Sequence, residues 1–291
     1  MKSIKQTIIS SPGVRDLIAE AKRKGPGAST EASGVSGSLT AFLAAAAYEA
    51  FSAGALLIAP DDETAEKLRD DCAALAGAGR VKFFGARPLH HAQALDLSAS
   101  IGQIETLEAL AAGERALVIA SPRSLSERVP PPEAFRKSVI SISVGTDHPF
   151  DALLRRLDDY NFERRDFVGG YGEYSVRGGI VDIFPYSGDN PVRVEFWGDR
   201  VESIREFDPM SQRSIRELTS SSIVPNISGA ARVDTSDHAS GQAAAVTAAS
   251  LISYLDPNAV VILSGQDFIR AEFDEMKNEG VVAEIPFDEL M

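Results

Sequence analysis

Two continuous apolar runs, ALLIA at residues 55–59 and ALVIA at residues 116–120, constrain the fold more than any other feature of this chain. Neither run alternates apolar with polar residues, so protein must cover both sides of each strand. Helical patterns with a one-sided apolar stripe separate the two runs, and Val81–Phe84 has the character of a further short strand. Strands of this kind alternating with helices are typical of a parallel sheet. Residues 1 to about 128 are therefore predicted to form an α/β layer.

The sequence pattern changes from continuous to alternating apolar runs after VPPPEAF, a proline-rich boundary at residues 129–135. Beyond it lie an alternating run, Val139–Val144, an amphipathic helix, Pro149–Tyr160, and short alternating segments joined by Asp, Gly, Asn and Pro turns. This pattern predicts an α+β unit with an antiparallel sheet. Within it the run ERRDF is interpreted as a solvated turn.

The last part of the chain again has the strand and helix pattern of the first part. Residues 226–242 are small and polar, as in a linker. A helix near Leu251–Leu255, a buried strand at Ala259–Leu263 and a charged helix through Phe268–Lys277 are expected after it. The middle unit is thus interpreted as an insertion in an α/β domain. The expected domains are residues 1–130, the first part of the α/β domain; 131–225, the inserted α+β domain; and 226–291, the linker and return segment.

Charge and cysteine content exclude several classes of function. The formal net charge is -13 and the isoelectric point is about 4.8, so the chain has little general attraction for nucleic-acid phosphates. The single cysteine, Cys72, excludes an internal disulfide and a multi-cysteine zinc site, and favours a reducing cytoplasm. His90 and His91 are adjacent, but no third ligand stands at a suitable spacing, so no metal site is expected. Neither a signal peptide nor a membrane-spanning run is visible.

The run SGVSGSLTAFLAAAAYEA has the outline of a phosphate-binding loop, a Gly-rich turn followed by a helix. Such a loop needs Gly-Lys-Thr/Ser, whose lysine neutralises phosphate and whose hydroxyl holds Mg²⁺. In this chain Leu39 replaces the glycine, Thr40 carries no positive charge and Ala41 offers no metal ligand. Tight Mg-nucleotide binding is therefore not expected. The positions of this degenerate phosphate loop are Gly34, Gly37, Leu39, Thr40 and Ala41.

A second nucleotide-site signal is also missing. The strand that should end in acidic residues to hold Mg²⁺ ends instead in Ser264-Gly265-Gln266, with Asp267 one place further on. No serine-histidine-acid set and no paired carboxylates are readable elsewhere. The sequence predicts no catalytic residues, no metal and no cofactor for this segment.

A candidate binding face comes from the strand VRVEFWG. Its period of two sends Val192, Val194 and Phe196 to the core and leaves Arg193, Glu195 and Trp197 on the other face. Arg and Trp are the residue types most enriched where proteins bind each other tightly.

Arg177 can join this face from a neighbouring strand. It precedes a Gly-Gly pair, which allows another backbone to approach closely. Spacing alone leaves two interpretations open. The face is either a protein-binding surface or an ordinary solvated sheet face on which Arg193 half covers Trp197 in a cation–π contact.

The run from Gly172 to Ile215, which includes VRGG, DIFP, RVEFWGD and FDP-SQRSI, resembles the transcription-repair coupling factor family, Mfd. Weaker resemblance extends to UvrB, the damage-binding subunit of excision repair. The flanking sequence, including GERALVIASPRSLSERVPPPEAF, resembles the same amino-terminal region of Mfd. The resemblance implies a degenerate RecA-like, P-loop-like domain with a parallel sheet, interrupted by an inserted α+β domain that binds UvrA. The family's UvrA-facing positions fall on Arg177, Arg193, Glu195 and Trp197, which favours the protein-binding interpretation.

Two departures from UvrB favour Mfd. UvrB has an intact lysine-containing phosphate loop, and it has an aromatic DNA-clamping hairpin, whereas no tyrosine occurs here between Tyr48 and Tyr160. The resemblance implies a non-catalytic module that recruits UvrA to lesion-stalled transcription complexes for nucleotide excision repair. ATP and Mg, RNA polymerase and double-stranded DNA are expected to bind only through domains outside these residues. The alternatives are a nucleotide-dependent DNA-translocase domain and a UvrB-like damage-binding domain.

Overall fold

The computed structural model describes residues 4–87, 97–226 and 249–279. The chain divides into two compact units, one formed by Met1–Arg128 with Ala249–Met291 and the other by Val129–Ala248. The His90-His91 pair and all but the first residue of the expected linker lie outside the described residues.

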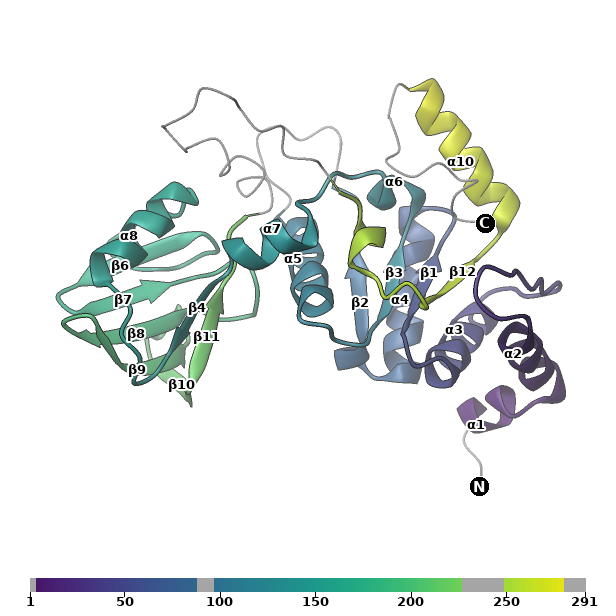
Figure 1. The fold of residues 1–291 in the computed structure, drawn as a ribbon, viewed down its shortest axis with the longest axis horizontal. Helices are drawn as coiled ribbons and strands as arrows, with labels where there is room; N and C mark the ends of the chain where they lie inside the picture. Colours follow the sequence, from purple (N-terminus) through teal and green to yellow (C-terminus); the bar gives the residue numbers. More distant parts are fainter. Residues whose placement is uncertain (1–3, 88–96, 227–248, 280–291) are drawn as a thin grey trace. The chain divides into compact units, whose positions relative to one another are not determined.

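The first unit contains a four-stranded sheet in the order β12-β1-β3-β2, whose paired strands are all parallel (Figure 1). Every residue of β1 and β3 is buried, so both faces of these central strands are covered, as the continuous apolar runs predict. The strands are β1 (Ala55–Ile58), β2 (Val81–Phe84), β3 (Leu117–Ala120) and β12 (Val260–Leu263).

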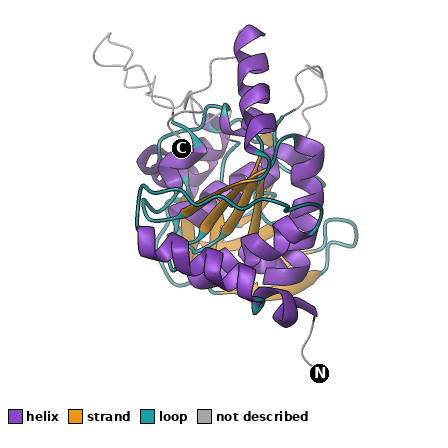
Figure 2. Cartoon of the chain, turned by 90° about the vertical axis from the view of Figure 1, so that its right-hand side faces the viewer, coloured by secondary structure: helices purple, strands orange, loops and turns teal. Residues whose placement is uncertain are grey.

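Helices surround this sheet (Figure 2). The alanine-rich α3 brings small side chains such as Ala44 and Ala45 against the sheet residues Leu57 and Ile119, and α4 adds Leu68 to the same buried cluster. The small side chains let the α3 backbone approach the sheet closely. The helices of this unit are α1 (Ile4–Ile9), α2 (Pro12–Lys24), α3 (Leu39–Ala50), α4 (Asp62–Ala76), α5 (Leu97–Ala111), α6 (Pro122–Leu125) and α10 (Gln266–Asn278), with 3₁₀ turns η1 (Ala78–Arg80) and η3 (Leu251–Tyr254).

Two expectations for the return segment need correction. The helix expected at Leu251–Leu255 is only the 3₁₀ turn η3. The strand β12 was expected to be buried, yet Val261 is 39% exposed. The reason is its position at the edge of the sheet, where β1 is its one hydrogen-bonded neighbour within the described part of the chain.

The second unit is built on a six-stranded sheet in the order β10-β9-β8-β7-β6-β5. Helix α8 (Phe150–Asp159) covers one face, with Leu153 and Leu157 fully buried and the Phe150 ring edge-on to Phe196 at 5.3 Å between centroids. The sheet strands are β5 (Glu163–Arg164), β6 (Glu173–Arg177), β7 (Ile180–Ile183), β8 (Val192–Trp197), β9 (Arg200–Phe207) and β10 (Ser214–Leu218).

This unit differs from a simple antiparallel meander in two places. Within ERRDF, expected to be a turn, Glu163 and Arg164 form β5, which pairs in parallel with β6. The alternating segment near Ile140 forms β4 (Ile140–Ser143), which pairs with β11 (Ser220–Ile223) in a separate two-stranded sheet. Helix α7 (Pro132–Ser138) precedes β4. The described part of the molecule is thus mixed α/β, as expected, with a parallel sheet in the first unit and, apart from the β5–β6 pair, antiparallel pairing in the second.

Among the described residues, no helix combines the length and the apolar character that crossing a membrane would require.

Candidate functional site

The strand β8 places three polar or aromatic side chains on the sheet face opposite helix α8. Burial alternates along the strand: Val192, Val194 and Phe196 are buried, while Trp197 is 81% exposed. This confirms the two faces expected from the period of two. Arg177, Arg193, Glu195 and Trp197 are hereafter called the arginine face.

The register of the sheet places Arg177 on this face. Asp182 on β7 pairs directly with Arg193 on β8 and with Ser175 on β6. Arg177 stands two residues after Ser175 and therefore projects from the same side of β6. The four side chains of the arginine face, one from β6 and three from β8, thus lie on the same side of the sheet as Asp182 of β7, the strand between them.

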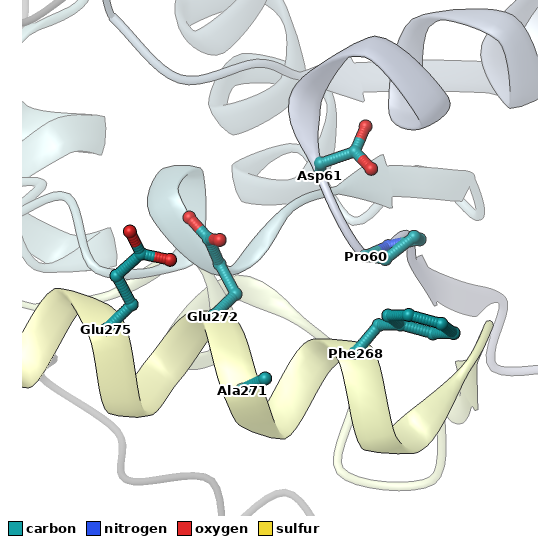
Figure 3. Close-up of a pocket in the computed structure, with 6 residues that line it drawn as sticks. All are labelled: Pro60, Asp61, Phe268, Ala271, Glu272 and Glu275. Atoms are coloured by element: carbon teal, nitrogen blue, oxygen red, sulfur yellow. The ribbon is translucent and has the colours of Figure 1, made fainter.

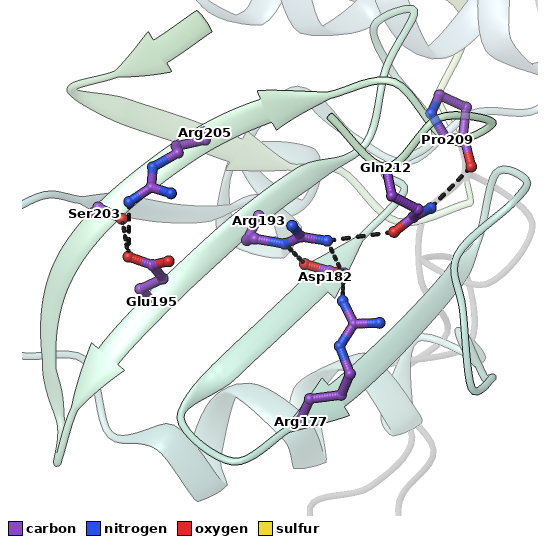
Figure 4. Close-up of polar contacts among 8 residues, drawn as sticks. All are labelled: Arg177, Asp182, Arg193, Glu195, Ser203, Arg205, Pro209 and Gln212. Atoms are coloured by element: carbon purple, nitrogen blue, oxygen red, sulfur yellow. Dashed lines mark hydrogen bonds and ion pairs between the residues drawn. The ribbon is translucent and has the colours of Figure 1, made fainter. Parts of the chain in front are cut away.

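The centre of the arginine face is a carboxylate that sequence reasoning missed (Figure 4). The Asp182 side chain is fully buried. Its Oδ1 accepts a hydrogen bond from Arg193 Nε at 2.6 Å, and its Oδ2 accepts one from Arg193 Nη2 at 2.8 Å. The same Oδ2 also accepts a hydrogen bond from Arg177 Nη2. The hydrogen bond to Asp182 raises the pKa of the Arg193 guanidinium above its usual value. The sequence signal that could have revealed it is a charged residue between Val181 and Ile183 in an otherwise apolar strand.

Each of the two arginines stacks on an aromatic ring. The Arg193 guanidinium lies over the Phe207 ring at 4.6 Å, and that of Arg177 lies over the Phe167 ring at 5.3 Å. The side chain of Arg193 is 18% exposed and that of Arg177 is 37% exposed. Arg193 therefore stacks on Phe207 and leaves the Trp197 ring open to solvent, unlike the alternative in which it covers the tryptophan.

Glu195 has partners of its own (Figure 4). Its carboxylate accepts hydrogen bonds from Ser203 Oγ at 2.7 Å and from Arg205 Nη2 at 3.0 Å. Its charge is thus neutralised by the neighbouring strand β9, separately from the Asp182 pair.

A small apolar cluster also lies beside the arginines. Val168, Phe184 and Phe207 are buried together, and Tyr171 packs against them with its ring 4.3 Å from that of Phe184. Phe207 is in contact with Arg193, so this cluster supports the arginine face. The sequence pattern had assigned apolar packing only to the opposite face.

The loop predicted to be a degenerate phosphate loop has two glycines with positive φ. Gly34 and Gly37 have φ of 73° and 57°, and helix α3 begins at Leu39. The Leu39 N–H donates to the Ser36 carbonyl at 3.3 Å and the Thr40 N–H to that of Gly37 at 3.2 Å. A phosphate-binding loop directs such amides at its ligand, whereas here they close turns of the loop. Both Thr40 and Ala41 are buried.

A cavity of about 420 Å³ lies between the end of β1 and helix α10 (Figure 3). Its lining residues are Pro60, Asp61, Phe268, Ala271, Glu272 and Glu275. Asp61 caps helix α4 by accepting from the Thr64 N–H at 2.7 Å, and Glu272 pairs with Arg123 at 2.7 Å. Two of the three carboxylates thus have structural roles. Within the described ranges no group of three or more His, Cys, Asp or Glu side chains is placed to hold a metal ion.

Comparison with known families gives this geometry a context. Residues 140–228 match the family model of the UvrB interaction domain. These residues run from β4 through β11 and include the whole arginine face.

Individual relatives point to one kind of protein. The transcription-repair-coupling factor of Bacillus subtilis (strain 168) is 34% identical over 194 residues, which are 66% of this chain and 16% of that protein. The Myxococcus xanthus protein of the same name is 33% identical over 203 residues, 66% of this chain and 17% of its own length. The protein of the same name from Mycobacterium tuberculosis (strain CDC 1551 / Oshkosh) is 42% identical over 102 residues, which are 35% of this chain and 8% of that protein.

The chain is therefore similar to the transcription-repair-coupling factors, and its residues 140–228 match the UvrB interaction domain, as its sequence led us to expect. The chain spans only a small part of these relatives: the matched residues are 16% of the Bacillus subtilis protein and 17% of the Myxococcus xanthus protein.

Proposed function

We propose that this chain is a non-catalytic, UvrB-like module that binds UvrA through the arginine face. Its role is to bring UvrA to transcription complexes stalled at lesions in the cytoplasm, so that nucleotide excision repair begins there. The main support is Trp197, a large aromatic ring that is 81% exposed beside two arginines, within the residues that match the UvrB interaction domain. Exposed tryptophan and arginine are the residue types that contribute most to protein binding.

The first unit supports this module as a scaffold. We interpret it as a RecA-like domain whose phosphate loop has lost its lysine, which removes the cation that triphosphate needs. Nucleotide-driven DNA translocation, and contacts with RNA polymerase and double-stranded DNA, are assigned to other parts of the longer relatives. The formal charge of -13 argues against a UvrB-like damage-binding role.

The charge of the arginine face favours an acidic partner surface. Arg177, Arg193 and Asp182 together carry a net charge of about +1, and the Arg205 guanidinium offsets Glu195. Complementary charge speeds encounter and fixes register, while the exposed Trp197 ring supplies apolar contact.

Reversing one charge tests this proposal. Arg193→Glu should weaken UvrA binding by on the order of 2–5 kcal/mol, because it removes a hydrogen-bonded charge and places a carboxylate beside Asp182. Titration calorimetry measures the affinity. Arg155→Glu is the matched control, since Arg155 is an exposed residue of α8, on the opposite face of the same sheet. Equal UvrA affinity for the wild type and Arg193→Glu would refute the site.

A further inference from the structure

The buried carboxylate of Asp182 is a charge that the core of a protein accepts only when it is fully paired. Both of its oxygens are used: Oδ1 by Arg193, and Oδ2 by Arg193 and Arg177 together. Two arginines from different strands, β6 and β8, are therefore tied to one point on the strand between them.

Further contacts restrict Arg193 from its other side. Its Nη2 also donates to Gln212 Oε1 at 3.3 Å, and Gln212 Nε2 donates to the Pro209 carbonyl at 2.8 Å (Figure 4). Gln212 itself has a left-handed backbone, with φ of 59°, and its N–H donates to the Asp208 carbonyl at 2.8 Å. Arg193 is thus fixed by Asp182, by Gln212 and by the ring of Phe207.

Each guanidinium nevertheless keeps donors for a ligand. Arginine has five N–H groups, and those of Nη1 enter no hydrogen bond with the described residues in either Arg177 or Arg193. These remaining N–H groups can donate charge-assisted hydrogen bonds to a carboxylate of a partner. Because both arginines are ordered before binding, the entropy cost of ordering their side chains is not added to the binding step.

We propose that Asp182 is a positioning residue for partner binding: it holds Arg177 and Arg193 together as a preformed donor pair for a carboxylate of UvrA. This inference rests on the function proposed above and names the residue on which the arginine face depends. Asp182 itself is fully buried and touches the partner only through the two arginines.

Neutralising Asp182 should change UvrA affinity in opposite directions, depending on whether net charge or the positioning of the two arginines controls binding. Asp182→Asn keeps the shape of the side chain and raises the net charge of the cluster from about +1 to about +2. If charge alone mattered, an acidic partner would bind more tightly. If Asp182 positions the arginines, the partner binds more weakly, by roughly tenfold, because two released side chains must be ordered on binding.

The experiment measures UvrA affinity by calorimetry for the wild-type chain and for Asp182→Asn. Glu202→Gln is the matched control, since it removes the same charge from an exposed position on β9 and should leave the affinity unchanged. Affinity that is unchanged or higher in Asp182→Asn overturns the inference. If Arg193→Glu abolishes binding while Asp182→Asn does not, the proposed function stands and only the role of Asp182 fails. If the wild type does not bind UvrA, the proposed function itself fails.

A second measurement does not depend on the folding of a variant. In the free wild-type chain, the Nε–H of Arg193 should give a sharp NMR signal protected from solvent exchange, because it donates to a buried carboxylate. The signal should persist when UvrA is added. A signal that is lost to rapid exchange in the free protein, and that appears only on binding, overturns the preformed pair.

Discussion

Trp197 extends a large aromatic ring from the end of β8 into solvent, at 81% exposure. Because exposed tryptophan and arginine are the residue types that contribute most to protein binding, we propose that this ring gains energy when a partner covers it. The other side chains of the arginine face, in contrast, make hydrogen bonds within the chain. Arg177 and Arg193 donate to Asp182, and Glu195 accepts from Ser203 and Arg205.

Trp197→Ala should therefore affect binding but not stability. We expect UvrA affinity to fall by about 2 kcal/mol, the loss typical of a dominant interface aromatic. The free energy of unfolding should change by less than about 0.5 kcal/mol, because the ring makes few contacts within the chain. Calorimetry and chemical denaturation measure the two quantities. Phe268→Ala is the control, an aromatic 73% exposed in the other unit, and equal loss of affinity in both variants would contradict the prediction.

Cys72 should be inert in the folded chain. Burial raises the pKa of its thiol to about 12, so the reactive thiolate is scarce at pH 8. We expect a disulfide reagent such as DTNB to react slowly with native protein and rapidly in denaturant. The raised pKa also makes stability depend on pH. The thiol ionises near pH 9 in the unfolded chain but only near pH 12 in the folded chain, so the free energy of unfolding falls as the pH rises from 9 to 12. Rapid native labelling at pH 8 would show that Cys72 is accessible.

At the scale of elements, the hairpin of β6 and β7 determines where Arg177 and Asp182 lie. Arg177 pairs with Ile180, so the turn consists of Gly178 and Gly179 alone. Only Gly178 has a positive φ, 61°, as in a type II′ turn. A Cβ on Gly179 would lie 2.6 Å from the Phe196 carbonyl oxygen of β8, which confirms the close approach expected from the Gly-Gly pair.

Gly179→Ala should accordingly destabilise the second unit by about 1–3 kcal/mol, because the added methyl group meets a backbone atom that cannot move freely. Chemical denaturation followed by far-ultraviolet circular dichroism measures the change. Gly169→Ala is the control in the same unit, since a Cβ there meets only an ordinary contact with Glu173 at 3.8 Å. Equal stability of the two variants would contradict the close approach.

At the scale of the whole molecule, the chain forms two compact units, and the residues of the first come from both ends of the sequence. Strand β12, from the carboxyl-terminal part, pairs with β1 along its full length. The arginine face lies entirely in the second unit, and the loop predicted to be a degenerate phosphate loop lies in the first.

The first unit should not respond to nucleotide. Addition of 5 mM ATP with Mg²⁺ should leave the melting temperature unchanged, because the loop carries Thr40 where a cation is needed and uses its amides internally. A ligand present at about 100 times its dissociation constant would stabilise the folded state by about 2.7 kcal/mol, which calorimetry detects readily. A nucleotide-dependent rise in melting temperature would revive the translocase interpretation.

The sequence by itself determined the types of the main elements and the face on which each side chain of β8 lies. Both follow from local periodicity, since a continuous apolar run must be covered on two sides and an alternating run on one. Only the tertiary structure decided that Asp182 links Arg177 with Arg193, that Phe207 supports them, and that β12 lies at a sheet edge. These features depend on which distant strands pair and in which register, and that choice is made by packing between segments far apart in the chain.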